Sequence, residues 1–276
     1  MQKDVENFDV PMRGYTLHAS YFGPRERTAL LLHGGGDTSS ADIFPLRVDL
    51  AERGIGTLAL DHRGHGLTGG SPEESSLALR VEEARAAIDA IRPRQLLGAV
   101  SMSMGGYVAV RLSQVVSLNA LVMIAPAMYD GKAFTAPFGP AFSHIIRRHE
   151  SWRDSDAFAI LKEFAGRILI VAGEQDRTIP AGVIEACVDA ITPSRFALIS
   201  LLGVDHFVMS RLRAGPADRL TEILDRMASV LLSNVQTLAS ADHFPGGVET
   251  VRSDAEPRDR SREMTGHTAI CTEGRS

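Results

Sequence analysis

One stretch of the chain indicates the fold more strongly than any other: Leu97-Gly98-Ala99-Val100-Ser101-Met102-Ser103-Met104-Gly105-Gly106. Its first half is apolar, as in a buried strand, and its second half carries the small residues with which a chain turns sharply into a helix. The residues two before and two after such a turn must be small, because strand and helix pass closely there. Ser101 and Gly105 meet this requirement for a turn at Ser103.

Two serines compete for the position at the turn. Glycine is the usual residue two positions before it, so Ser101 departs from the pattern. A turn at Ser101 itself, with Ala99 before it and Ser103 after it, is also compatible with the sequence. We favour Ser103, because Gly105 and Gly106 should open the helix directly after the turn.

Apolar runs alternate with amphipathic stretches on both sides of this turn. After a weak hairpin pattern in the first 25 residues, strands are expected at 29–32, 57–60, 95–100, 120–124, 167–171 and 195–202. Helices are expected at 44–53, 77–91, 105–114, 180–190 and 217–232. Apolar strands separated by helices predict a parallel sheet covered on both faces. The expected fold class is α/β, with an eight-stranded, mostly parallel sheet flanked by helices.

Two segments break this alternation. Residues 129–164 interleave prolines and aromatic residues with charged ones, and we expect a small inserted lid there. Residues 241–276 are too polar to bury enough apolar surface, which predicts a disordered tail. We therefore expect one domain over residues 1–240, with the lid inserted at about 129–164.

Composition narrows the class of protein and its setting. The 276 residues, 44% of them hydrophobic, suffice for one core, and a net charge of −5 without a long basic block argues against nucleic-acid or membrane partners. Cys187 and Cys271 are the only cysteines, so neither a disulfide framework nor a zinc site is indicated. The charged first residues and the lack of a long apolar run favour a cytoplasmic protein.

A serine at such a turn is a candidate nucleophile. Its hydroxyl reacts poorly until a base removes the proton, and the base needs an anionic group to orient it. Asp176 follows the strand expected at 167–171, and His206 follows the strand expected at 195–202. Both should therefore lie at the carboxyl edge of the sheet, where catalytic groups of open α/β sheets gather.

Three other carboxylates compete with Asp176. Glu174 lies in the same loop, Asp130 follows an earlier strand, and Asp205 directly precedes His206. Adjacent side chains on an extended segment point apart, which counts against Asp205. We select Asp176, and mutation must separate it from Glu174.

Attack on a carbonyl group also requires donors for the negative charge that develops on its oxygen. His33-Gly34-Gly35-Gly36 directly follows the strand at 29–32, and this backbone can present an N–H to that oxygen. We expect the amides of Gly35 and Met104 to form an oxyanion hole. The loosely spaced His62 and His65 do not form a metal motif, and we expect no metal. Asp61 and Arg63 should instead brace their own loop.

Together these motifs resemble the α/β-hydrolase superfamily over about residues 28–232, particularly the short-lid serine esterases and lipases of the monoacylglycerol-lipase and serine-aminopeptidase-like groups. The order Ser103, Asp176, His206 is the order of that fold. The resemblance implies hydrolysis through an acyl-serine intermediate without a cofactor. It does not identify the substrate, because one scaffold hosts many chemistries.

The lid should decide the substrate. Its aromatic residues either line an acyl pocket or pack the lid on the core: Phe134, Phe138, Phe142 and Trp152. The run Arg147-Arg148-His149 favours a solvated face over an anion site. We expect hydrolysis of a carboxylic ester or thioester with a small or medium apolar acyl group. The alternatives are an acyltransferase or cyclase and a weakly catalytic binding protein. The expected partner is a small molecule, free or bound to a carrier protein.

Overall fold

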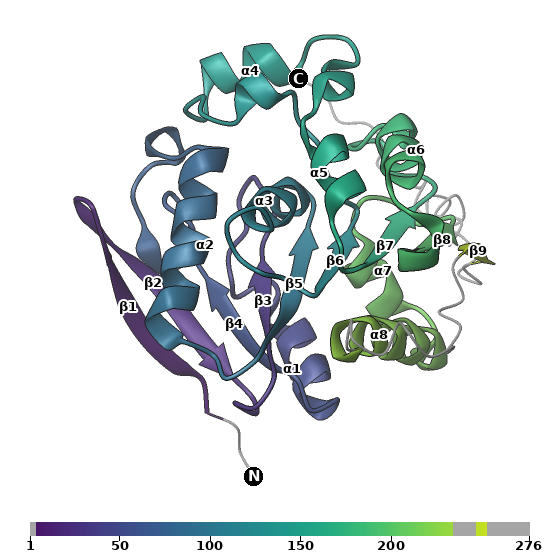
Figure 1. Ribbon diagram of the computed structural model, residues 1–276, viewed down its shortest axis with the longest axis horizontal. Helices are drawn as coiled ribbons and strands as arrows, with labels where there is room; N and C mark the ends of the chain where they lie inside the picture. Colours follow the sequence, from purple (N-terminus) through teal and green to yellow (C-terminus); the bar gives the residue numbers. More distant parts are fainter. Residues whose placement is uncertain (1–3, 234–246, 253–276) are drawn as a thin grey trace, which may run out of the picture.

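A single sheet runs through the molecule, with strands in the order β1-β2-β4-β3-β5-β6-β7-β8-β9 (Figure 1). This computed structural model describes residues 4–233 and 247–252. Its strands are β1 (Glu6–Met12), β2 (Tyr15–Phe22), β3 (Thr28–Leu32), β4 (Gly56–Leu60), β5 (Leu96–Met102), β6 (Ala120–Ile124), β7 (Arg167–Gly173), β8 (Phe196–Leu202) and β9 (Gly247–Arg252). The pairs β1–β2 and β2–β4 are antiparallel, and all other neighbouring strands are parallel. The predicted α/β class and mostly parallel sheet are confirmed.

Helices cover both faces of the sheet. One face packs against α2 (Leu77–Ile91), α3 (Met104–Leu112), α5 (Ala157–Glu163) and α6 (Ala181–Ala190). The other face packs against α1 (Phe44–Glu52), α7 (Val208–Ala214) and α8 (Ala217–Leu232). Each helix turns one apolar stripe inward, so the sheet separates two hydrophobic cores. None of the helices in the described part of the chain is both long and apolar enough to cross a membrane.

A ninth strand, β9, lies at one edge of the sheet, next to the eight that the sequence predicts. Eight strands lie within residues 6–202, but β9 comes from the polar segment that was expected to be disordered. It pairs in parallel with β8, from Ala197 opposite Gly247 to Leu202 opposite Arg252. A strand edge offers unpaired backbone groups to any extended segment, so pairing does not require a strongly apolar sequence. The rest of the predicted tail lies outside the described residues.

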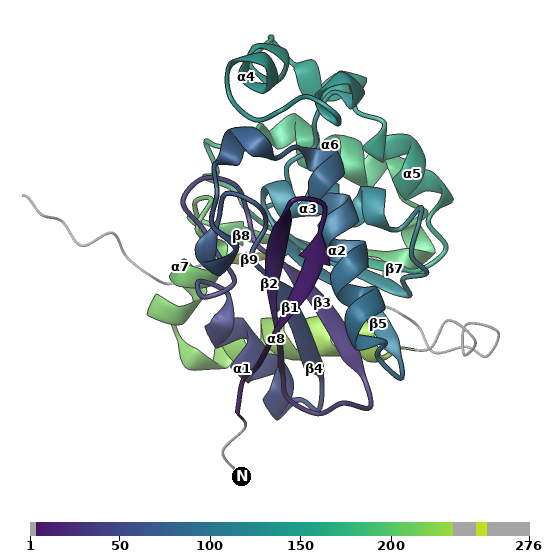
Figure 2. The ribbon, with the colours of Figure 1, turned by 90° about the vertical axis from the view of Figure 1, so that its left-hand side faces the viewer.

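The segment between β6 and β7, called the inserted segment below, includes the residues for which a lid is expected. It holds α4 (Pro140–Ile146), the short 3₁₀ turns Gly131–Ala133 and Ser151–Asp154, and finally α5. Figures 1 and 2 both place α4 at the top of the molecule, outside the layer of helices on the sheet. In contrast, α5 contacts α3 and α6 and belongs to that layer.

The parallel strands bring distant parts of the sequence to one edge. Because β3, β5, β7 and β8 all run in the same direction, the loops that follow them meet at their carboxyl ends. These loops contain His33 to Gly36, Ser103, Asp176 and His206.

Candidate active site

The sharp turn of the chain lies at Ser103, between the end of β5 and the start of α3. Ser103 has φ 50° and ψ −117°, a conformation that residues other than glycine rarely adopt. Its N–H donates to Ile124 O at 3.0 Å, and its carbonyl accepts the N–H of Ala127 at 3.0 Å. A Cβ on Gly105 would lie 2.8 Å from the carbonyl oxygens of Leu32 and His33, so that position has no space for a side chain.

Ser101 occupies a different environment. It is a fully buried residue of β5, paired with Leu32 on one side and Met123 on the other. Its hydroxyl donates to Val122 O at 3.4 Å. Ser101 is therefore an ordinary strand residue at the position where the usual pattern has glycine, and the strained turn is at Ser103.

A hydrogen-bonded series connects Ser103, His206 and Asp176. The Ser103 Oγ lies 3.1 Å from His206 Nε2, and His206 Nδ1 lies 2.7 Å from Asp176 Oδ2. The other carboxylate oxygen of Asp176 accepts the N–H groups of Thr178 at 2.8 Å and Ile179 at 2.9 Å. The side chains of His206 and Asp176 are 16% and 9% exposed, so the series is ordered by the protein yet reached by solvent.

The competing carboxylates have other partners. Glu174 accepts the Ser200 hydroxyl at 3.1 Å, and Asp130 is buried against Arg148. Asp205 pairs with Arg211, whose hydrogen bonds lower the pKa of that carboxyl group. Among these acids, only Asp176 is hydrogen-bonded to His206.

Two backbone amides next to Ser103 have no hydrogen-bond partner among the described residues: those of Gly35 and Met104. Met104 is the first residue of α3, where helix N–H groups have no partner within the helix. The glycine loop lies against it, since a Cβ on Gly34 would be 3.5 Å from Ser103 Cβ and one on Gly35 would be 2.9 Å from Met104 Cε. The structure therefore brings both predicted oxyanion donors to the same place as the series.

A family model described as the alpha/beta hydrolase family matches residues 29–247. The chain belongs to the α/β-hydrolase family. The match covers the sheet from β3 to β8 together with every residue of the site described above.

Solved structures share the fold of this α/β-hydrolase at low sequence identity. Est1E from Butyrivibrio proteoclasticus with bound ferulic acid has a TM-score of 0.64 and 19% identity, over 82% of this chain and 100% of that chain. A monoacylglycerol lipase from Paleococcus ferrophilus has a TM-score of 0.60 and 17% identity, over 78% and 98%. A putative hydrolase from Agrobacterium vitis S4 has a TM-score of 0.61 and 18% identity, over 84% and 100%. No curated protein matches the sequence.

A second group of polar residues in this α/β-hydrolase lies beneath the glycine loop. This buried cluster consists of His33, His62, His65, Arg80 and Glu83, of which His65 is 7% exposed and the others no more than 1%. His62 Nδ1 donates to Glu83 at 2.7 Å, and Arg80 donates to His65 Nε2 at 2.6 Å. Burial lowers the pKa values of all three histidines, and the positive charge of Arg80 acts in the same direction. These histidines therefore hold the loops together as neutral rings.

The loop between β4 and α2 is braced largely as predicted. Asp61 accepts the N–H groups of Ser40 at 2.7 Å and Leu67 at 2.8 Å, whereas Arg63 forms its ion pair with Glu74 at 2.7 Å. Within residues 4–233 and 247–252, no group of three or more His, Cys, Asp or Glu side chains is placed to hold a metal ion.

The predicted pocket residues separate into two sets. Phe138 and Phe142 pack edge to face with centroids 4.9 Å apart, and Phe134 lies under the guanidinium of Arg111 at 3.6 Å. Trp152 packs instead against α6, where a Cβ on Gly182 would be 2.7 Å from its ring, and against Phe158. The contacts of Phe134 with Arg111 and of Trp152 with Gly182 join the inserted segment to α3 and α6, whereas the other two contacts lie within the segment. A role of these residues in substrate binding remains a prediction.

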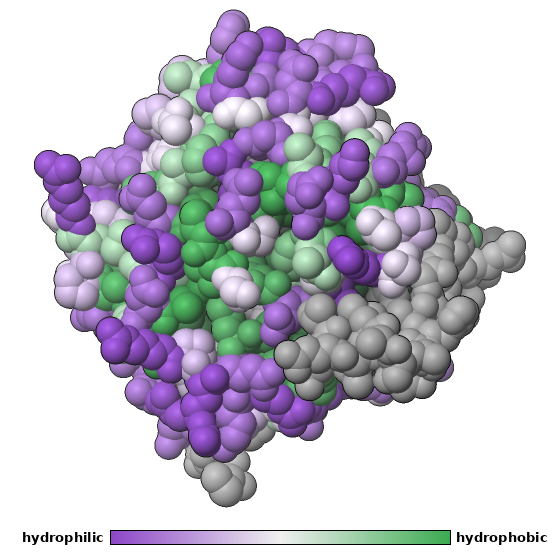
Figure 3. All heavy atoms as spheres, in the orientation of Figure 1, coloured by the Kyte–Doolittle hydropathy of each residue, from purple (hydrophilic) through white to green (hydrophobic). Residues whose placement is uncertain are grey.

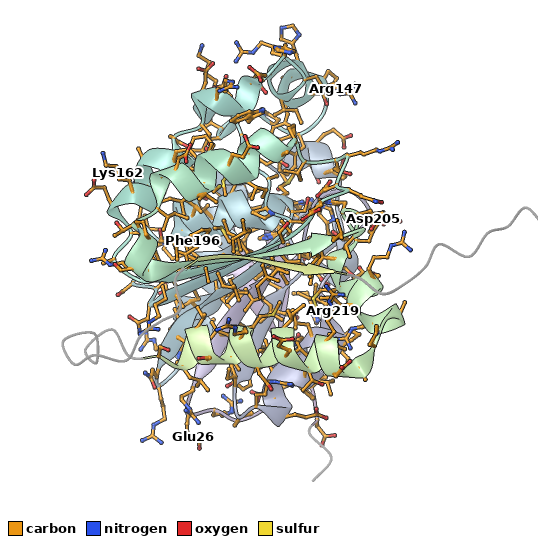
Figure 4. All side chains as sticks on the ribbon, turned by 90° about the vertical axis from the view of Figure 1, so that its right-hand side faces the viewer. Glu26, Arg147, Lys162, Phe196, Asp205 and Arg219 are labelled. Carbon is orange, nitrogen blue, oxygen red and sulfur yellow. The ribbon has the colours of Figure 1, made fainter. Side chains whose placement is uncertain are left out.

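The basic residues Arg147 and Arg148 directly follow α4. Arg147 is exposed at the outer tip of the inserted segment, while the labelled Asp205 lies far below it beyond the end of β8 (Figure 4). The top of the molecule that carries α4 is mostly hydrophilic (Figure 3). Arg148 pairs with Asp130, so this residue fastens α4 to the start of its own segment.

Arg80 and Glu83 were missed by the sequence analysis. Both lie on the inward face of α2 among Leu77, Val81 and Ala84, all of them buried. The sequence did contain a signal for them, because Arg80 and Glu83 lie three and six residues after Leu77, within the apolar stripe of the predicted helix. Charged side chains are rarely buried in such a stripe unless they are paired.

Proposed function

We propose that this protein is a serine hydrolase that cleaves a carboxylic ester or thioester of a small or medium apolar acyl group. One observation carries the proposal: Ser103 Oγ lies 3.1 Å from His206 Nε2, and His206 Nδ1 lies 2.7 Å from a carboxylate that is itself fixed by two backbone N–H groups. A serine, a histidine and an oriented carboxylate in this geometry form a catalytic triad.

In the first half of the reaction, Ser103 Oγ attacks the carbonyl carbon of the substrate while His206 Nε2 accepts the hydroxyl proton. Asp176 holds the tautomer of His206 and stabilises its positive form. The N–H groups of Gly35 and Met104 bind the oxygen that becomes negative in the tetrahedral intermediate. The intermediate then expels the alcohol or thiol, which takes the proton from His206 and leaves an acyl group on Ser103.

In the second half, water takes the place of the leaving group. His206 accepts a proton from this water as its oxygen attacks the acyl carbon, and the same two amides bind the oxyanion again. Collapse of the intermediate releases the carboxylic acid and returns the proton to Ser103. Every step uses side chains and amides of this chain, so no cofactor is required.

The neighbouring structures support ester chemistry, because Est1E holds ferulic acid and another neighbour is a monoacylglycerol lipase. The aromatic residues of the inserted segment, Phe138 and Phe142 among them, support an apolar acyl group. We expect the substrate to be a small molecule of the cytoplasm, free or attached to a carrier protein.

A panel of p-nitrophenyl esters and acyl thioesters, from acetyl to dodecanoyl, tests this proposal. We expect turnover that peaks at one chain length and falls about 10⁴-fold or more in Ser103→Ala. Ser101→Ala is the matched control, two residues away in the same stretch, and should keep kcat within about threefold. Full activity in Ser103→Ala would overturn the proposal. Product masses reveal whether water or another nucleophile accepts the acyl group.

A further inference from the structure

The carbonyl oxygen of Gly34 accepts hydrogen bonds from two residues of the buried cluster. Arg80 Nη1 donates to it at 2.9 Å, and His33 Nδ1 lies 2.9 Å from the same oxygen. This carbonyl and the N–H of Gly35 belong to one peptide unit, and in a trans peptide they point in opposite directions. Fixing the carbonyl therefore fixes the direction of the Gly35 N–H.

We propose that Arg80 is a positioning residue, which aims the Gly35 N–H at the oxyanion by holding the Gly34 carbonyl on the opposite side. The proposal rests on the proposed function, because only an acyl-transfer site needs that donor. Arg80 acts through Gly34 and does not itself contact the reacting atoms.

The Arg80 guanidinium is buried and is held by contacts on several sides. It is 1% exposed, its guanidinium lies 5.0 Å from the centroid of the Phe138 ring, and its second terminal nitrogen donates to His65 Nε2 at 2.6 Å. No ion pair to Arg80 occurs within the described ranges. The negative charge of Glu83 in the same cluster acts on Arg80 without a direct ion pair, so the hydrogen bonds to Gly34 and His65 are the direct polar contacts of this buried cation.

The contacts of the neighbouring histidines determine which of their ring nitrogens donate and which accept. Arg80 can only donate, so His65 Nε2 must accept, and His65 Nδ1 donates to Thr38 O at 2.9 Å. His33 Nε2 accepts the N–H of His62 at 3.3 Å, which leaves His33 Nδ1 to donate to Gly34 O. The Thr38 hydroxyl donates to the next carbonyl, that of Gly35, at 3.2 Å. The carbonyls of Gly34 and Gly35 are thus both fixed by hydrogen bonds.

The chain offers a matched control in Arg47. This arginine is 2% exposed, donates to Ser20 and Thr57 of β2 and β4, and packs near Phe22 and Phe44. Burial lowers the pKa of each of these two arginines to about 10. They share burial and the lack of an ion pair, but only Arg80 contacts the glycine loop.

The experiment compares Arg80→Met, Arg80→Lys and Arg47→Met with the wild-type protein. The readouts are kcat and KM for the best ester of the panel and the Kd of a trifluoromethyl ketone carrying the same acyl group, whose adduct with serine mimics the oxyanion. We expect Arg80→Met to lower kcat at least about tenfold and to raise the Kd of the ketone by a similar factor, while KM stays within about threefold of the wild-type value. Arg80→Lys should lie between, because a single ammonium group cannot reach both Gly34 O and His65. Arg47→Met should lower the thermal midpoint and leave kcat and ketone affinity within about twofold.

Two results would overturn the inference. One is a folded Arg80→Met or Arg80→Lys protein with wild-type kcat and ketone affinity. The other is an equal loss of both in Arg47→Met, which would make the effect one of general stability. Should Arg80→Met fail to fold, Arg80→Lys decides by the same readouts. A wild-type protein whose activity survives Ser103→Ala would refute the proposed function itself, an outcome distinct from either of these.

Discussion

Two polar groups meet at Ser103, and they differ in how the protein treats them. The series Ser103–His206–Asp176 comes from the ends of β5, β8 and β7 and remains partly open to solvent. The buried cluster of His33, His62, His65, Arg80 and Glu83 is almost entirely closed to it. A group that must meet a substrate cannot be fully buried, whereas one that only holds a loop gains geometric precision from burial. Changes in the series should therefore affect activity, and changes in the buried cluster should also affect stability.

The largest expected effect lies in the series. Asp176→Asn should lower kcat by about 10³- to 10⁴-fold, because the amide can stabilise the wrong tautomer of His206 and cannot balance its positive charge. Glu174→Gln, in the same loop, should keep kcat within about twofold. Steady-state kinetics on the best ester measures both. Equal losses would mean that Glu174 shares the role, and the free energy of unfolding should change by less than about 1 kcal/mol in either variant.

The buried cluster should show its largest effect at Glu83. This carboxylate accepts the Tyr15 hydroxyl at 2.6 Å, the N–H of Arg63 at 3.0 Å and His62 Nδ1 at 2.7 Å. Glu83→Gln replaces one accepting oxygen with an NH₂ group, which cannot accept a hydrogen bond from any of these three donors. It should lower the free energy of unfolding by about 3 kcal/mol in urea titrations. Glu82→Gln changes the exposed neighbour on the same helix and should stay within about 0.5 kcal/mol. A comparable loss in both variants would remove the distinction between the two groups.

Acid should weaken the buried cluster before it affects the rest of the fold. The pKa values of His33 and His65 are lowered by burial, so the unfolded chain binds protons more readily than the folded one. This contribution to stability is therefore present above about pH 6.5, the usual pKa of a histidine in an unfolded chain, and is lost as the pH drops below that value. Urea titrations at several pH values measure this. The exposed His144 and His149 serve as the control, since replacing both with Gln should leave the pH dependence unchanged.

The smallest effect is expected at a third polar contact, which involves neither the series nor the buried cluster. Asp156 accepts the Tyr107 hydroxyl at 2.7 Å and pairs with Arg111, which connects the inserted segment to α3. Asp156→Asn should lower the free energy of unfolding by about 1 kcal/mol and change kcat less than about threefold. Tyr107→Phe removes the same hydrogen bond from the other side and should behave alike. A large loss of kcat in both would show that α3 transmits changes to Ser103.

The sequence predicted features that local patterns encode. The turn at Ser103, the apolar strands and the loops carrying Asp176 and His206 could all be placed, because each depends on residues close in the chain. Since parallel strands share one carboxyl edge, these local placements also predicted the assembled site. For these three residues the structure adds the distances between their side chains and no further residue.

Features that depend on distant neighbours could not be placed in the same way. The strand β9 pairs with the edge of β8, and no pattern within residues 247–252 indicates that this edge is available. Arg80 is separated by 46 residues from the carbonyl it holds. Trp152 is aromatic and lies in the insertion, but its contact with Gly182 of α6 decides where it packs. For Trp152 the sequence left open whether the ring lines a pocket or packs on the core.

The central claim is that Ser103 is the nucleophile and that His206 activates it. A fluorophosphonate probe followed by peptide mass spectrometry tests it most directly, because the probe reacts with an activated serine whatever the natural substrate. We predict a single phosphonylated residue, Ser103, with labelling slowed at least about 10³-fold in His206→Ala and unchanged in Ser101→Ala. Labelling at Ser101, or labelling of Ser103 at the same rate without His206, would contradict the account.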